Sequence, residues 1–353
     1  MFIGKEVFGV KGEENNVIVG NGARAKSAFW HKLLPLIGLL ILCFVIWHIG
    51  PSKIVRALAE LNYRLLLPLP ALIVSVLVVQ VVKWQLILCS QEIDVSFGAL
   101  FRSNLIGVFY GALTPGRVGM LIKVRYLASF AKRPVNDLIS AMVIDKLMEL
   151  VTLGCFSTVS AVVLARTLNW AVFALVLAAT GGFVLLLFAL FPKSAPGRIV
   201  GGILRAVIPR TWRQSLKERI QLVHDTMPTV RALVFPGLLS LFCWLLIWTQ
   251  TYVVARALGI DIGYGLFIVA VPLGALVSLI PITVSGVGTR ELTLAGLFSV
   301  FGVPPERTVL MSLLSMVLCM YPPALLGALL ATRTLNSEQP EVTNGNKDCQ
   351  QKK

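Results

Sequence analysis

The sequence T-V-S-G-V-G at residues 283–288 interrupts a long apolar stretch that covers residues 264–302. A related sequence, T-P-G-R-V-G at 114–119, lies in another apolar stretch, 97–119. Proline, glycine and hydroxyl-bearing residues inside apolar segments favour broken helices, because the freed backbone groups must find partners within the protein or a wet cavity. We therefore expect two discontinuous or re-entrant helical hairpins.

The two interrupted stretches are flanked by long apolar runs with matching spacing. The short sequences begin at residues 114 and 283, an offset of 169. Moving the runs 66–90 and 138–165 by this offset places them over the runs 232–257 and 308–331. A unit of span, broken helix and span therefore occurs twice, which predicts an internal repeat.

The overall composition is that of an integral membrane protein. Hydrophobic residues make up 56% of the 353 residues, and only 14% are charged, about half the fraction of an ordinary soluble domain. A bilayer is crossed by about 20 mostly apolar residues, and about six runs approach that length. These runs cover approximately Leu33–Ile49, Leu66–Ser90, Leu138–Ala165, Leu168–Phe191, Ala232–Ala257 and Thr308–Ala331.

Basic residues in the loops predict the orientation of the chain. With the N-terminus in the cytoplasm, the inside segments hold 23 Lys and Arg residues and the outside segments hold 6. This bias predicts that both termini are cytoplasmic. The first unit then starts outside and the second inside, so the copies are inverted, as in many secondary transporters. The expected fold class is an all-α polytopic membrane protein with about six full spans and two broken hairpins arranged as an inverted repeat.

The domain organisation follows from these runs. We expect a cytoplasmic segment 1–32, a transmembrane domain 33–332 with repeat halves of about 66–165 and 232–332, and a disordered tail 333–353. The segment 192–231 carries 8 basic and 2 acidic residues. Its apolar residues recur at helical spacing, which predicts amphipathic helices on an anionic leaflet or a solvated loop. Because the membrane accounts for the +15 net charge, no nucleic acid partner is expected.

Four charged residues fall well inside expected spans, away from their ends. Asp145, Lys146 and Glu149 occur in the run 138–165, and Lys83 occurs in the run 66–90. Charges at this depth are costly unless they are paired or face a polar path. Lys146 lies three residues before Glu149 and can pair with it. The group either forms structural ion pairs or lines a substrate path and carries protons, and snorkelling of Lys83 to the interface explains that lysine alone.

The breaks hold the candidate substrate site. Glycines let a ligand approach the backbone, helix N-termini favour anions, and arginine matches phosphate or carboxylate oxygens. Arg117 and Arg290 could therefore bracket an anionic headgroup. Alternatively, Arg117 is only a cytoplasmic positive charge, and Arg290 pairs with Glu291 or a carbonyl. The candidate headgroup-binding residues are Thr114, Pro115, Gly116, Arg117, Ser285, Gly286, Gly288, Arg290 and Glu291.

No cofactor or resident metal is expected from the sequence. The six cysteines contain no C-x-x-C pair, and the three histidines have no metal-ligand spacing. The only acidic pair suited to a divalent ion is Glu92-x-Asp94, which is a weak signal.

Several sequences resemble one known family. T-P-G-R-V-G (114–119), V-I-D-K-L (143–147), I-P-I-T-V-S-G-V-G-T-R-E (280–291) and L-F-S-V-F-G-V-P (297–304) are similar to the flippase-like transmembrane region of lysylphosphatidylglycerol synthases. The resemblance covers about 33–332 and implies a stand-alone flippase-like membrane domain without the soluble aminoacyl-transfer domain. It departs at Met120, where the family often has an acidic residue, and at Lys123, where arginine is frequent.

These observations predict a lipid translocase, not an enzyme, in the cytoplasmic membrane of a prokaryote. The resemblance implies movement of an anionic phospholipid or a polyprenyl-linked lipid across the bilayer, and a lipid-modifying enzyme is a possible partner. Two alternatives remain at this point. The chain could be a membrane-embedded transferase acting on a lipid phosphate, with Glu92 and Asp94 holding a metal, or a non-transporting scaffold for a lipid-modifying enzyme.

Overall fold

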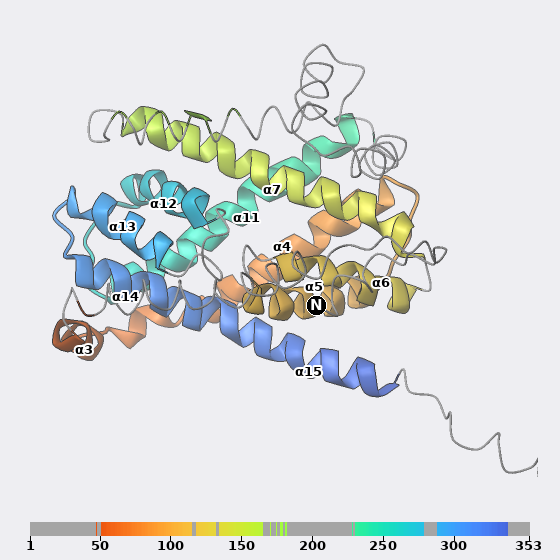
Figure 1. Ribbon diagram of the computed structural model, residues 1–353, viewed down its shortest axis with the longest axis horizontal. Helices are drawn as coiled ribbons and strands as arrows, with labels where there is room; N and C mark the ends of the chain where they lie inside the picture. Colours follow the sequence, from red (N-terminus) through yellow and green to blue (C-terminus); the bar gives the residue numbers. More distant parts are fainter. Residues whose placement is uncertain are drawn as a thin grey trace, which may run out of the picture.

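The computed structural model describes residues 51–114, 118–131, 134–164, 230–278 and 288–337, together with seven isolated positions. All regular structure in these ranges is helical, which confirms the all-α prediction (Figure 1). The principal helices are α3 (Pro51–Ala59), α4 (Leu69–Cys89), α5 (Phe97–Leu113), α6 (Lys123–Ala131), α7 (Val135–Val163), α11 (Val230–Ala257), α12 (Tyr264–Ser278), α13 (Thr289–Ser299), α14 (Pro305–Ser315) and α15 (Tyr321–Ser337). Outside the described residues lie the expected segment 1–32, the expected spans 33–49 and 168–191 apart from six isolated positions, nearly all of the basic segment 192–231, and the tail beyond 337.

Among the described residues, three helical segments are long and apolar enough to cross a membrane. They are Tyr63–Cys89, Arg231–Ala257 and Pro305–Arg333, and they correspond to three of the expected spans. The expected span 138–165 forms α7, whose 29 residues include three charged side chains near its centre. Large apolar side chains are exposed on the three apolar segments, including Val74, Phe242 and Leu325. An exposed apolar surface of this kind is suited to lipid.

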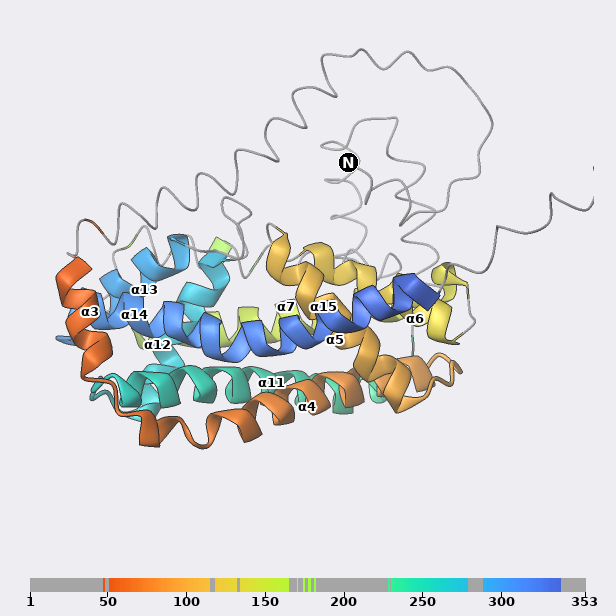
Figure 2. The same cartoon turned by 90° about the horizontal axis from the view of Figure 1, so that it is seen from below.

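The helices pack as two units that make corresponding contacts. The first unit contains α4 to α7 and the second contains α11 to α15. Helix α5 corresponds to α12, and α7 corresponds to α14 and α15. Accordingly, α5 packs against α15 just as α12 packs against α7, and α4 packs directly against its counterpart α11. Figure 1 shows α4 and α11 running in opposite directions, as do α7 and the pair α14 and α15. Figure 2 shows α4 and α11 side by side along one edge of the bundle.

The first break is closed by hydrogen bonds across it. Helix α5 ends at Leu113, and the Thr114 hydroxyl donates to the Tyr110 carbonyl at 3.0 Å while accepting from the Gly119 N–H at 2.7 Å. A Cβ atom on Gly119 would lie 2.2 Å from the Tyr110 carbonyl oxygen, so only glycine fits there. A short 3-10 turn, η2 (Val118–Ile122), then leads into α6.

The segment η2 and α6 packs closely against α5 at two glycines of α5 that are four residues apart. A Cβ on Gly107 would lie 2.9 Å from Lys123 Cβ, and one on Gly111 would lie 2.4 Å from Met120 Cγ. Small residues at this spacing allow helices to approach closely in membranes. Gly107 and Gly111 therefore determine where the side chains of Met120 and Lys123 lie.

In the second interrupted stretch, α12 is described to Ser278 and α13 begins at Thr289, while residues 279–287 between them lie outside the described residues. Gly288 has φ of 92°, a conformation that strongly favours glycine, and it precedes the first residue of α13. Its N–H donates to Glu291 Oε2 at 2.6 Å. Glu291 thus satisfies a free N–H at the start of α13.

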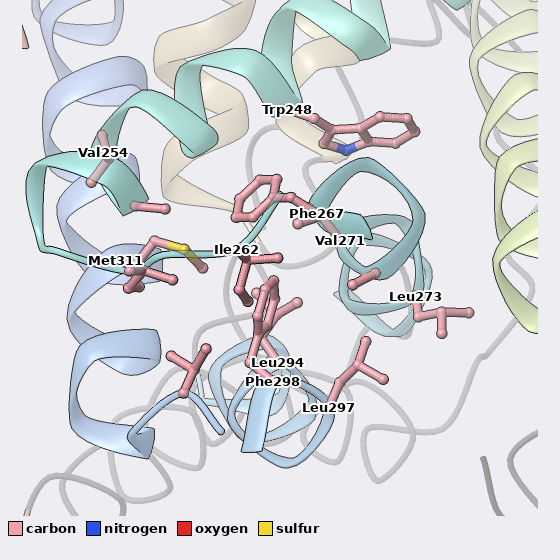
Figure 3. Packing of buried hydrophobic residues seen from close by; sticks show 14 of the residues in the cluster. Trp248, Val254, Ile262, Phe267, Val271, Leu273, Leu294, Leu297, Phe298 and Met311 are labelled. Carbon is pink, nitrogen blue, oxygen red and sulfur yellow. The ribbon is translucent and has the colours of Figure 1, made fainter. Parts of the chain in front are cut away.

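The last span has a π-helical turn, η3 (Met316–Met320), between α14 and α15. Single π turns within α-helices are frequent at functional sites. The largest apolar core lies mostly in the second unit, where Trp248, Phe267 and Phe298 pack with aliphatic side chains (Figure 3). A second core in the first unit surrounds Trp84. Together these cores fix the helices that supply the polar residues described next.

Candidate functional site

A buried ionic cluster joins α4, α6 and α7. Lys83 Nζ lies 2.8 Å from Asp145 Oδ1 and 3.0 Å from Glu149 Oε1. Lys123 Nζ lies 3.1 Å from Asp145 Oδ2 and 4.1 Å from the centre of the Trp84 ring, over which it sits. Lys83, Lys123 and Asp145 are each at most 3% exposed. This pairing compensates charges that would be costly at this depth.

The cluster corrects two expectations from the sequence. Lys83 does not extend to the interface, because it is 1% exposed and bound to Asp145 and Glu149, with Ser240 Oγ 3.5 Å away. Lys123 belongs to the buried cluster, although it is one of the 23 basic residues that the loop count assigned to the inside, in the segment 91–137. Neither pairing could be read from the sequence, since the partners lie on different helices.

One edge of the cluster is accessible. Lys146 Nζ donates to Glu149 Oε2 at 2.6 Å, which confirms the pair expected from their spacing. These side chains are 28% and 26% exposed. Lys146 Nζ also lies 4.0 Å from Met120 Sδ, and the Trp244 indole N–H donates to the Glu149 carbonyl at 3.2 Å. Three lysines and two carboxylates make the cluster net positive by one charge.

The second unit contributes Arg290 and Glu291. Glu291 is fully buried, and its Oε1 accepts from the Ser312 hydroxyl at 2.6 Å and from Arg290 Nη2 at 3.1 Å. Arg290 Nη2 also donates to the Ser312 carbonyl at 3.0 Å. Arg290 therefore has both of the partners that were expected as alternatives, namely Glu291 and a backbone carbonyl. Among the described residues, Arg290 Nη1 has no hydrogen-bond partner, and the side chain is 20% exposed.

Two adjacent cavities, which share lining residues, bring these groups together. The larger has a volume of about 400 Å³, and Lys146, Glu149 and Arg290 all line it. The smaller has a volume of about 160 Å³ and is lined largely by apolar residues of α4, α5, α11 and the middle of the last span. Six residues line both cavities: Gln80, Met120, Ile247, Thr251, Arg290 and Ser315. Arg290 therefore lies at the junction of the two compartments.

The expected site residues fall into four groups. Lys146, Glu149 and Arg290 meet at the larger cavity, whereas Lys83, Asp145 and Glu291 are buried behind or beside it. Thr114 and Gly288 have structural roles at the ends of the breaks. Pro115, Gly116, Arg117, Ser285 and Gly286 lie outside the described residues.

Several residues of this site were not among the expected site residues, although Met120 and Lys123 were noted as departures from the family that the sequence resembles. Met120, Gln80 and Trp244 line the larger cavity, and Lys123 completes the buried cluster. The G-x-x-x-G spacing of Gly107 and Gly111 was a usable signal, because it marks the face of α5 against which the segment with Met120 and Lys123 packs.

Glu92 and Asp94 lie away from these cavities. Both are exposed just beyond the end of α4, and neither is among the lining residues of the two cavities. Within the described ranges, no three His, Cys, Asp or Glu side chains gather in a geometry that could hold a metal ion.

The fold and cavities define a class: a polytopic helical membrane protein built from two inverted units, with two adjacent cavities lined by both polar and apolar residues. The chain belongs to the family of the lysylphosphatidylglycerol synthase transmembrane region, whose model matches residues 33–327. It is 26% identical over 297 residues to a UPF0104 membrane protein of Methanothermobacter thermautotrophicus, covering 78% of this chain and 88% of the relative. A UPF0104 membrane protein of Pyrococcus horikoshii is 24% identical over 324 residues, covering 85% and 96%.

Proposed function

We propose that this protein is a lipid translocase that moves an anionic phospholipid or a polyprenyl-linked lipid across the cytoplasmic membrane. The observation that carries the proposal is the position of Arg290, which lies at the junction of two compartments and has a guanidinium nitrogen available to a ligand. Family membership agrees with this function, as does the inverted arrangement of the units, which is frequent in transporters.

The two compartments match the parts of a lipid. The smaller cavity, with apolar residues such as Ile73, Val76 and Val108, suits the first part of a hydrocarbon tail. The larger, with charged and hydroxyl-bearing residues, suits a headgroup. A phosphate between them would face Arg290, whose planar fork matches phosphate oxygens.

The surrounding residues take distinct roles in this proposal. Glu291 orients Arg290, because both of its oxygens are already engaged by protein groups. Lys146 and Glu149 line the headgroup compartment, and Lys83, Asp145 and Lys123 hold α4, α6 and α7 around it. Arg117 remains a candidate second phosphate ligand. Both termini would be cytoplasmic, and the protein would act on lipids without forming a covalent bond to them.

A reconstituted assay tests the proposal. Purified protein in liposomes should move fluorescent anionic phospholipids or polyprenyl phosphates between leaflets faster than protein-free vesicles. Arg290→Ala should reduce the rate at least about tenfold, since hydrogen bonds to charged groups contribute about 1.5–3 kcal/mol. Arg256→Ala is the matched control, because Arg256 is exposed at the end of α11 and pairs with exposed Asp261. Movement at the protein-free rate for every anionic lipid tested would refute a translocase.

A further inference from the structure

The larger cavity has an aromatic platform that phosphate recognition leaves unused. Trp244 and Trp248, one helical turn apart on α11, both line it and stack with ring centroids 5.5 Å apart and an interplanar angle of 29°. The inner ring, Trp248, packs edge-on against Phe156 at 4.6 Å, and Figure 3 shows it at the margin of the apolar core. The outer ring, Trp244, is partly exposed. Its N–H bond to the Glu149 carbonyl fixes the ring against α7.

Polar groups of every kind surround this platform. Glu149 supplies a carboxylate that only accepts hydrogen bonds, and Lys146 supplies an ammonium that only donates them. Gln80 and Thr251 add an amide and a hydroxyl to the lining of the same cavity. Hydrogen-bond donors and acceptors, both charged and neutral, therefore line the cavity together with the two stacked indoles. The cavity volume of about 400 Å³ is typical of small-molecule sites.

This combination distinguishes between headgroup chemistries. A bare phosphate would use Arg290 and Lys146 but leave the indole faces without a partner. A cationic amine would be attracted by the rings and by Glu149, but it would meet two cations, Lys146 and Arg290, in the same cavity. A pyranose ring is neutral, and its C–H face is attracted to the negative face of an indole. Its hydroxyls both donate and accept, so they can pair with Glu149, Lys146 and Gln80 together.

We propose that the larger cavity is a carbohydrate subsite, with Trp244 as its stacking platform, for a sugar attached to the lipid phosphate. This rests on the proposed function and specifies its substrate class as a glycosyl phosphate lipid. The phosphate lies at Arg290, the sugar lies over Trp244 between Lys146 and Glu149, and the start of the tail occupies the smaller cavity. Trp248 and Phe156 support the platform from behind.

Binding by the purified full-length protein tests the proposal directly. The probes are citronellyl phosphate and its glucosyl, mannosyl and N-acetylglucosaminyl phosphodiesters, titrated in detergent by calorimetry. At least one glycosyl compound should bind about tenfold more tightly than the unglycosylated phosphate. Trp244→Leu should abolish that difference and leave citronellyl phosphate binding unchanged, whereas Trp244→Phe should retain part of it. The exposed Trp170→Leu serves as the matched control and should change neither affinity.

The outcomes separate this proposal from the one on which it rests. If citronellyl phosphate binds in an Arg290-dependent way but no sugar improves binding, the carbohydrate subsite is refuted and the translocase proposal stands. Equal weakening of all four probes by Trp244→Leu, with normal unfolding temperature, also refutes the subsite. If no anionic probe binds and none is moved in liposomes, both proposals fall.

Discussion

Lys83 on α4 and Asp145 on α7 form an ion pair of 2.8 Å in which the side chains are only 1% and 2% exposed. Taking two charges out of water is costly, so such a pair persists only with good geometry and further partners. Asp145 has a second partner, Lys123 on α6, at 3.1 Å. One carboxylate thus links three helices of the first unit, and its loss would leave more unpaired charge than the loss of either lysine.

This relationship predicts an unequal effect of two substitutions. Asp145→Asn should lower the free energy of unfolding by about 3–5 kcal/mol, because Lys123 then has no carboxylate partner. Lys83→Met should cost less, since Lys123 with Asp145 and Lys146 with Glu149 remain as two pairs. Chemical denaturation of the detergent-solubilised protein measures both. A larger loss for Lys83→Met would show that Asp145 is not the centre of the cluster.

The close packing of α5 predicts a graded response to alanine. Gly119→Ala should disrupt folding, because its Cβ would meet the Tyr110 carbonyl oxygen at 2.2 Å. Gly111→Ala should fold but lose transport, because its Cβ would displace the Met120 side chain, which lines the cavity. Gly98→Ala is the control, since its Cβ meets nothing within 4 Å. Yield, unfolding temperature and translocation rate distinguish the three, and a Gly119→Ala protein as stable as wild type would contradict the geometry of the break.

Substitutions at Met120 should reveal the charge preference of the cavity. Its Sδ lies 4.0 Å from Lys146 Nζ, so Met120→Glu would place a carboxylate beside that ammonium. The added negative charge should slow translocation of anionic lipids about tenfold, whereas Met120→Gln, of similar size and neutral, should have a small effect. Initial rates in proteoliposomes give the comparison. Equal rates for the two variants would show that this wall does not face the lipid phosphate.

Substitution of Glu291 should reduce both stability and transport. Its oxygens accept from Gly288 N–H, the Ser312 hydroxyl and Arg290, all within the protein. Glu291→Gln should destabilise the protein by about 1–3 kcal/mol and should release Arg290 from its fixed position. In a double-mutant cycle with Arg290→Gln, the effects on transport should be strongly non-additive. Strictly additive effects would show that Glu291 does not act through Arg290.

Two cysteines report whether the smaller cavity contains water. Cys319 lines that cavity in the π-helical turn, whereas Cys155 is exposed on α7. In otherwise cysteine-free proteins in liposomes, a charged methanethiosulfonate reagent should modify Cys319 and leave Cys155 unreacted, because the thiolate forms only where water is present. Mass spectrometry detects the adduct. Modification of Cys155 alone would show that the cavity is closed to water and that α7 is not covered by lipid at this position.

Much of the architecture could be predicted from local sequence patterns. The six-residue sequences at 114 and 283 marked both breaks, and the offset of 169 predicted the repeat, because both signals are written in consecutive residues. The Lys146 and Glu149 pair was also predictable, since residues three apart share a helix face.

The buried cluster was not predictable in the same way. The pairing of Lys83 with Asp145 depends on how α4 packs on α7, and that packing is determined by many side chains at once. Lys83 lies seven residues before Ser90, so a long flexible amine could have reached the interface on sequence grounds. The position of Trp244 beside Glu149 likewise follows from tertiary packing between α11 and α7.

The two units are alike in their helices but not in their chemistry. The positions 169 residues beyond Lys83 and Asp145 hold Tyr252 and Leu314, so the ionic cluster has no counterpart in the second unit. Two conformations that exchange the roles of the units would be equal in energy only if the units were chemically identical. If the proposed translocase alternates between two such conformations, this asymmetry favours one of them when the site is empty, and the return step of each cycle then differs in barrier from the forward one.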